Sequence, residues 1–123
     1  MRHKGYLLEV AVRQGLAHLL DFQGLLVHKD RKKLFTVFVD QQPLKIEEMR
    51  QALADGDLKE VAFMAHTLKG GAATMGAEVL KDRAYEVEKA AKTEDADLAE
   101  REIEALASEL EETIQVMREF MER

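Results

Sequence analysis

The residues best suited to chemistry lie in one short stretch, AFMAHTLKGGAATMGAEVL, at residues 62–80. It contains a histidine, a lysine three residues later and two adjacent glycines, within a segment whose other residues favour a helix. Neutral imidazole is a nucleophile near physiological pH, because the unperturbed pKa of histidine is about 6.5. His66 could therefore attack phosphorus, and Lys69, one helical turn away, could neutralise phosphoryl oxygens.

A helical wheel predicts that His66 points away from the core. With about 100° per residue, the apolar side chains of residues 57–76 gather at about 160–240° from His66. Its neighbours on the outer face are lysines, a phenylalanine and small residues, namely Lys59, Ala62, Phe63, Lys69, Gly70 and Ala73. Gly70 costs about 1 kcal/mol relative to alanine, and access for a partner would explain that cost. Gly71 projects toward the core edge, where we expect close helix–helix contact.

Other chemistries are less compatible with this stretch. LKGGAAT lacks the glycine pattern of a phosphate loop, so a phosphoryl group must come from another protein. We expect no metal site, because no histidine or carboxylate lies four residues from His66. Ser108, the only serine, has no nucleophile-elbow glycines around it, which argues against a hydrolase. The absence of cysteine excludes disulfides and cysteine-rich zinc sites.

Composition indicates one helical domain. The chain has 123 residues and a single proline, with 46% apolar, 34% charged and 6% aromatic residues. A net charge of −6 disfavours nucleic-acid binding, and HKDRKK at residues 28–33 is interpreted as a solvated helix start. Charged residues break the N-terminal apolar stretch, which predicts neither a signal peptide nor a membrane span. We expect a soluble, cytoplasmic protein, unless the chain is a piece of a larger membrane-bound one.

Apolar periodicity and capping signals predict four helices. The first runs from Arg31 through Pro43 to the ADGD turn, as one bent helix or two helices in line. The second begins after the N-cap Asp57 and ends near Gly76, and the third ends around residue 92. The last follows a cap at residue 93 or 95, with a seam formed by Ile103, Leu106, Leu110, Thr113, Met117 and Phe120.

These elements predict an all-α, antiparallel up-down four-helix bundle over residues 31–123. Residues 1–30 are apolar on too many sides for a simple amphipathic helix, and we interpret them as an N-terminal helical cap or extension. We expect a single domain overall.

The stretch AHTLKGGAATMGA, residues 65–77, resembles the signature of histidine-containing phosphotransfer (HPt) domains. That signature is His-x-x-Lys-Gly followed by small residues and a Gly-Ala turn. The resemblance covers residues 31–92 well and the last helix only in pattern, whereas residues 1–30 hardly match. It implies a four-helix bundle that shuttles a phosphoryl group between receiver-domain aspartates. His66 would then be phosphorylated, with Lys69 and Gly70 as the flanking functional pair.

The resemblance also draws attention to Glu88. In some family members a glutamine on the following helix bonds the active histidine, and Glu88 occupies the aligned position. A carboxylate there could accept the Nδ1–H of His66 and leave Nε2 as the nucleophile. Alternatively, Glu88 is a surface residue paired with Lys92 at the next turn. Glutamate departs from the glutamine pattern, and its charge would repel a phosphoryl group.

Three functions remain open. The first is a phosphorelay intermediate with no catalytic activity of its own, whose partners are receiver domains and a hybrid histidine kinase. It would need no cofactor, since magnesium would belong to the receiver. Receivers would dock on the small-residue face around His66, at Lys59, Ala62, Phe63 and Ala73. The second is the phosphoacceptor domain of a chemotaxis-type histidine kinase, and the third is a non-catalytic helical adaptor.

Overall fold

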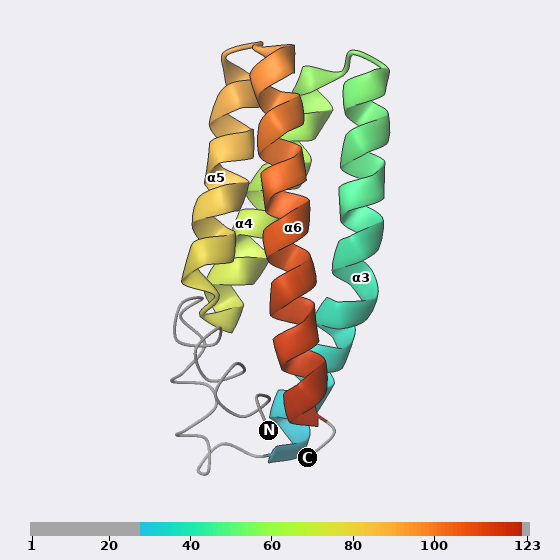
Figure 1. The fold of residues 1–123 in the computed structure, drawn as a ribbon, viewed down its shortest axis with the longest axis vertical. Coiled ribbons are helices and arrows are strands. Elements are labelled where there is room, and N and C mark those ends of the chain that lie inside the picture. Colours follow the sequence, from blue (N-terminus) through green and yellow to red (C-terminus); the bar gives the residue numbers. More distant parts are fainter. Residues whose placement is uncertain (1–27, 122–123) are drawn as a thin grey trace.

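The computed structural model describes residues 28–121, which form four antiparallel helices (Figure 1). In chain order these are α3 (His28–Ala54), α4 (Leu58–Met75), α5 (Glu78–Lys92) and α6 (Ala96–Met121). The predicted all-α four-helix bundle is confirmed. The N-terminal segment predicted at residues 1–30 lies outside the described residues, apart from residues 28–30, which belong to α3.

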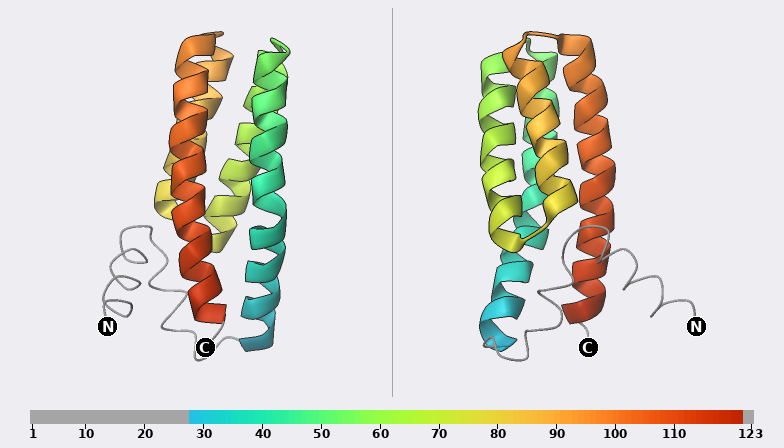
Figure 2. Two further views of the ribbon diagram at one scale, coloured as in Figure 1. Left: turned by 45° about the vertical axis from the view of Figure 1, so that its right-hand side comes forward. Right: turned by 90° about the vertical axis from the view of Figure 1, so that its left-hand side faces the viewer.

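Each helix packs against two neighbours, because α3 and α5 both lie against α4 and α6. The interior contains large apolar side chains from all four helices, and those fully buried include Met49, Met75, Leu80, Ile103, Leu106 and Met117. The predicted seam of α6 is buried as far as Met117. Figure 2 shows that α3 and α6 extend beyond the turn between α4 and α5 at one end of the bundle. Within residues 28–121, no helix is both long and apolar enough to cross a membrane.

Short polar caps fix where the helices begin and end. The Asp57 side chain accepts a hydrogen bond from the backbone N–H of Glu60 at 3.1 Å, which confirms the predicted start of α4. Gly76 ends α4 in the left-handed conformation with φ of 76°, which glycine adopts without strain. Asp95 rather than Thr93 caps α6, because its carboxylate accepts from the Leu98 N–H at 3.0 Å.

Pro43 lies inside α3, which is one continuous helix. The first predicted element is therefore a single helix and not two helices in line. Its ring is exposed on α3. The proline removes one backbone donor, and the helix nevertheless continues on both sides of it.

The cap at Asp57 can be tested by substitution. Asp57→Ala removes an acceptor for one of the unpaired N–H groups of the first turn of α4, and we expect the free energy of unfolding to fall by about 1 kcal/mol. Chemical denaturation measures this change. Asp55→Ala is the matched control, because its carboxylate accepts from the exposed Gln51 side-chain amide at 3.1 Å and caps no helix. Equal losses in the two variants would contradict the capping account.

Candidate functional site

His66 lies near the middle of α4 with its side chain 64% exposed. Phe63, one turn earlier, is 65% exposed, and Gly70, one turn later, is also at the surface. A Cβ added at Gly70 would meet no atom within 4 Å, so the glycine is not required for packing within the bundle. The imidazole is therefore open to an approaching molecule, as the sequence predicted.

Glu88 on α5 contacts Nδ1 of this imidazole. Its Oε2 lies 3.0 Å from Nδ1 of His66, and the residue is only 3% exposed. The alternative of a surface glutamate is therefore wrong, because α5 packs against α4 and encloses this carboxylate. The predicted pairing with Lys92 is nevertheless present, since Nζ of Lys92 lies 3.0 Å from the same Oε2.

A second ammonium group completes the surroundings of Glu88. Nζ of Lys69 lies 2.8 Å from Oε1, so both carboxylate oxygens face cationic groups. Burial raises the pKa of Glu88, but hydrogen bonds from Lys69, Lys92 and His66 outweigh burial and hold this pKa at about 2. Glu88 is therefore ionised at neutral pH.

The charge of Glu88 determines which nitrogen of His66 is reactive. An ionised carboxylate can only accept hydrogen bonds, so the contact at Nδ1 requires a proton on that nitrogen. In the neutral ring the lone pair then lies on Nε2. The buried glutamate thus leaves Nε2 as the nucleophilic atom of a largely exposed imidazole.

Tyr85 and Lys92 were not among the candidate site residues from the sequence. Nζ of Lys69 lies 4.9 Å from the centre of the Tyr85 ring, and Nζ of Lys89 lies 4.7 Å from it, so the ring attracts both ammonium groups. Tyr85, Glu88 and Lys92 are spaced three and four residues apart and share one face of α5. That spacing, once Glu88 was a candidate, could have identified both residues.

The prediction that the residues around His66 all lie on the outer face of α4 is partly wrong. Lys59 and Ala73 are exposed as predicted, but Ala62 is buried and Lys69 is only 27% exposed along its side chain. The wheel placed the core directly opposite His66, whereas Ala62 belongs to the buried core, and Lys69, seven residues later on the same side of α4, contacts Glu88 of α5. A Cβ at Gly71 would meet no atom within 4 Å, so the close helix–helix contact expected there is absent.

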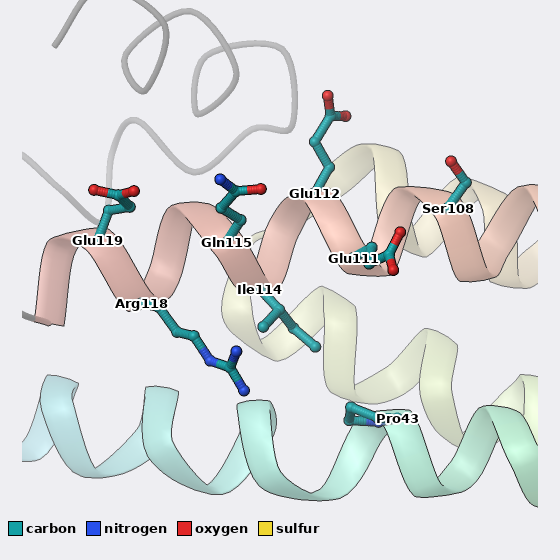
Figure 3. A pocket seen from close by; sticks show the side chains of 8 residues that line it. All are labelled: Pro43, Ser108, Glu111, Glu112, Ile114, Gln115, Arg118 and Glu119. Atoms are coloured by element: carbon teal, nitrogen blue, oxygen red, sulfur yellow. The ribbon is translucent and has the colours of Figure 1, made fainter. Parts of the chain in front are cut away.

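A pocket with a volume of about 860 Å³ lies along α6, and it is lined by seven residues of that helix and by Pro43 of α3 (Figure 3). Its lining includes Ser108 and the carboxylates of Glu111, Glu112 and Glu119, with Arg118 as its basic residue. These carboxylates would repel a phosphoryl group, and no residue of the His66 cluster lines the pocket. No group of three or more potential metal ligands occurs among residues 28–121.

The fold and the site define a helical bundle with an exposed imidazole nucleophile, His66. Its Nδ1 is bound to the buried Glu88, and Nε2 is left to react. The family model of the Hpt domain matches residues 33–118, a range that includes His66, Lys69, Gly70 and Glu88. The chain therefore belongs to the Hpt domain family. Such domains carry phosphoryl groups in two-component and phosphorelay signalling. Comparison with curated proteins and with solved structures gave no match.

The pKa of Glu88 gives a testable pH dependence. Its folded-state value of about 2 is below the ordinary 4.5, so the unfolded state binds more protons between these values. The stabilisation is complete above about pH 4.5 and is lost as the pH falls through about 2. We expect Glu88→Gln, which mimics the protonated form, to be less stable than the wild type at pH 6 by up to about 3 kcal/mol.

Urea unfolding of both proteins from pH 6 to pH 2 measures this difference. The other carboxyl groups titrate in both chains, so subtraction isolates position 88. The stability gap should shrink toward zero at the acid end. A gap that stays constant over this range would show that Lys69, Lys92 and His66 do not lower the pKa of Glu88.

Proposed function

We propose that this chain is a phosphorelay intermediate, in which Nε2 of His66 accepts a phosphoryl group from a receiver-domain aspartate and passes it to another. The observation that carries the proposal is the contact between Nδ1 of His66 and the buried, ionised Glu88. It orients the ring so that the lone pair lies on the other nitrogen. Membership of the Hpt domain family supports phosphotransfer as the reaction class.

The proposed step is a displacement at phosphorus. The lone pair of Nε2 forms the N–P bond, while the bond between phosphorus and the aspartate carboxylate oxygen breaks and its electrons leave with that oxygen. The ring keeps its Nδ1 proton and becomes positively charged. Glu88, 3.0 Å from Nδ1, stabilises this new charge. Reversal of the same step delivers the phosphoryl group to the next aspartate.

Lys69 would supply positive charge for the phosphoryl oxygens. It lies one turn from His66, and its ammonium group rests between Oε1 of Glu88 and the Tyr85 ring. Phosphoryl transfer depends mainly on positioning and on neutralising charge, so one lysine beside the histidine is a suitable contribution from this chain. We place the magnesium ion in the partner receiver, and propose that the carrier has no catalytic activity alone.

The docking surface for the receiver is proposed to lie over the exposed part of α4. Lys59, Phe63, Gly70 and Ala73 are all at the surface around His66, whereas Ala62 is left out because it is buried. Phe63 is the large apolar side chain of this surface, and the small residues let a partner approach the ring. A receiver, whether free or part of a hybrid histidine kinase, is the proposed occupant.

Transfer from phosphorylated receivers tests the function. Receiver domains from the same genome, each labelled with radioactive acetyl phosphate, are mixed with the chain, and acid-labile, base-stable label on it is measured. We expect His66→Gln to abolish labelling and His3→Gln, the matched control at another histidine, to keep it. Label on His66→Gln would contradict the assignment.

The same assay separates the alternatives. Labelling only by an ATP-dependent histidine kinase, and by no receiver, would instead indicate the phosphoacceptor domain of a chemotaxis-type kinase. Receiver binding that does not depend on His66 and transfers no label would indicate a helical adaptor.

A bulky residue at Gly70 should block docking without unfolding the chain. Gly70→Leu adds a side chain one turn from His66 into open space, and we expect transfer to slow by at least about tenfold, as for other misplacements at a reacting centre. Gly71→Leu is the matched control, since it makes the same change about 140° around the helix from His66.

Both leucines should raise helix stability by similar small amounts, because leucine favours a helix over glycine. Circular dichroism at increasing temperature checks this point. Equal transfer rates for the two folded variants would show that the surface at Gly70 is not approached by the partner.

A further inference from the structure

Three potential hydrogen-bond donors converge on the single carboxylate of Glu88, one at Oε1 and two at Oε2. Lys69 contacts Oε1, whereas His66 and Lys92 share Oε2, each at 3.0 Å. When the imidazole is neutral, the cluster has one negative charge and two positive charges. Lys92 is therefore a second ammonium group beyond the one that neutralises the buried glutamate.

Phosphorylation changes this balance. A phosphoryl group brings a charge of about −1.5 to −2 at neutral pH, and it would lie on the exposed side of the His66 ring. Lys69 would then be attracted both to the phosphoryl oxygens and to Glu88. If Lys69 were the only lysine at Glu88, its departure would deprive a buried carboxylate of its ammonium partner, which is strongly unfavourable.

We propose that Lys92 is a positioning residue for phosphotransfer: it keeps Glu88 neutralised, so that Lys69 can turn to the phosphoryl group on His66. Its ion pair is intrahelical, four residues along α5, so it persists whichever way Lys69 turns. The Lys92 side chain is 65% exposed and contacts Oε2, the carboxylate oxygen that also contacts Nδ1 of His66. This inference rests on the proposed function of His66.

The neighbouring Lys89 provides a matched comparison. It lies on the same helix, but its Nζ pairs with Glu86 at 3.1 Å and lies over the Tyr85 ring. Removing either lysine subtracts one positive charge from the same end of α5. Only Lys92 contacts Glu88, so an effect through this carboxylate should separate the two.

The test measures an equilibrium rather than a rate, because docking alone cannot change it. A receiver phosphorylated with acetyl phosphate, freed of the donor, is mixed with each variant, and the label is divided between receiver and chain. We expect Lys92→Gln to shift the equilibrium toward the receiver by roughly fivefold, the effect of losing one partly exposed ion pair. Lys89→Gln should stay within about twofold of the wild type, and Lys92→Arg should restore the wild-type ratio.

A double-mutant cycle shows whether Lys92 acts through Glu88. In a Glu88→Gln background there is no buried charge to neutralise, so adding Lys92→Gln should leave the equilibrium unchanged. A shift of the same size in both backgrounds, or no shift in the single variant, would overturn the inference while His66 remains the acceptor. A wild-type chain that takes no label from any receiver would overturn the proposed function, and this inference with it.

Discussion

The structure depends on keeping one buried carboxylate neutralised between two helices. Glu88 is almost completely enclosed, yet its pKa of about 2 keeps it ionised, because Lys69, Lys92 and His66 donate to it. An enclosed charge without such partners would destabilise the bundle, so the register of α4 against α5 must keep these groups together. Because Glu88 binds Nδ1 of His66, Nε2 is left as the nucleophilic nitrogen of the ring.

Only one of the two glycines beside this cluster has an explanation in the structure. Neither packs against a neighbouring helix, because a Cβ at either position would meet open space. Gly70 lies one turn from His66 on the exposed side, where a larger side chain would obstruct a docking receiver. Nothing in the structure explains Gly71. The weakening of α4, about 1 kcal/mol for each glycine relative to alanine, is therefore only partly accounted for by access.

Much of the fold was predictable because its signals are local. Asp57 marks the start of α4 through its side-chain carboxylate and Gly76 marks the end through its backbone N–H, and both were recognised from the sequence. The burial of Ala62 was not predictable in the same way. A helical wheel shows where one helix is apolar, but it cannot show which flank a neighbouring helix covers, and Ala62, expected on the open face, is buried.

The candidate site was likewise predictable where its residues are close in the sequence, and less so where they lie on different helices. His66, Lys69 and Gly70 share a five-residue motif, so the sequence alone brings them together. Glu88 is 22 residues from His66, and its position was inferred only through the family resemblance. Its burial and its pairing with Lys69 depend on how α5 lies against α4, whereas its pairing with Lys92 lies within α5 and was predicted from the sequence. Tyr85 and Lys92 share the face of α5 that carries Glu88, so their spacing could have added them to the site once Glu88 was a candidate.

The central claim is that Glu88 binds Nδ1 of His66 and so directs phosphorylation to Nε2. Nuclear magnetic resonance of the chain with ¹⁵N-labelled histidine rings, after phosphorylation by a receiver, tests this most directly. The account predicts a ¹⁵N–³¹P coupling at Nε2 of His66 and a proton on Nδ1. Phosphorus on Nδ1 of His66, or on a different histidine, would contradict it.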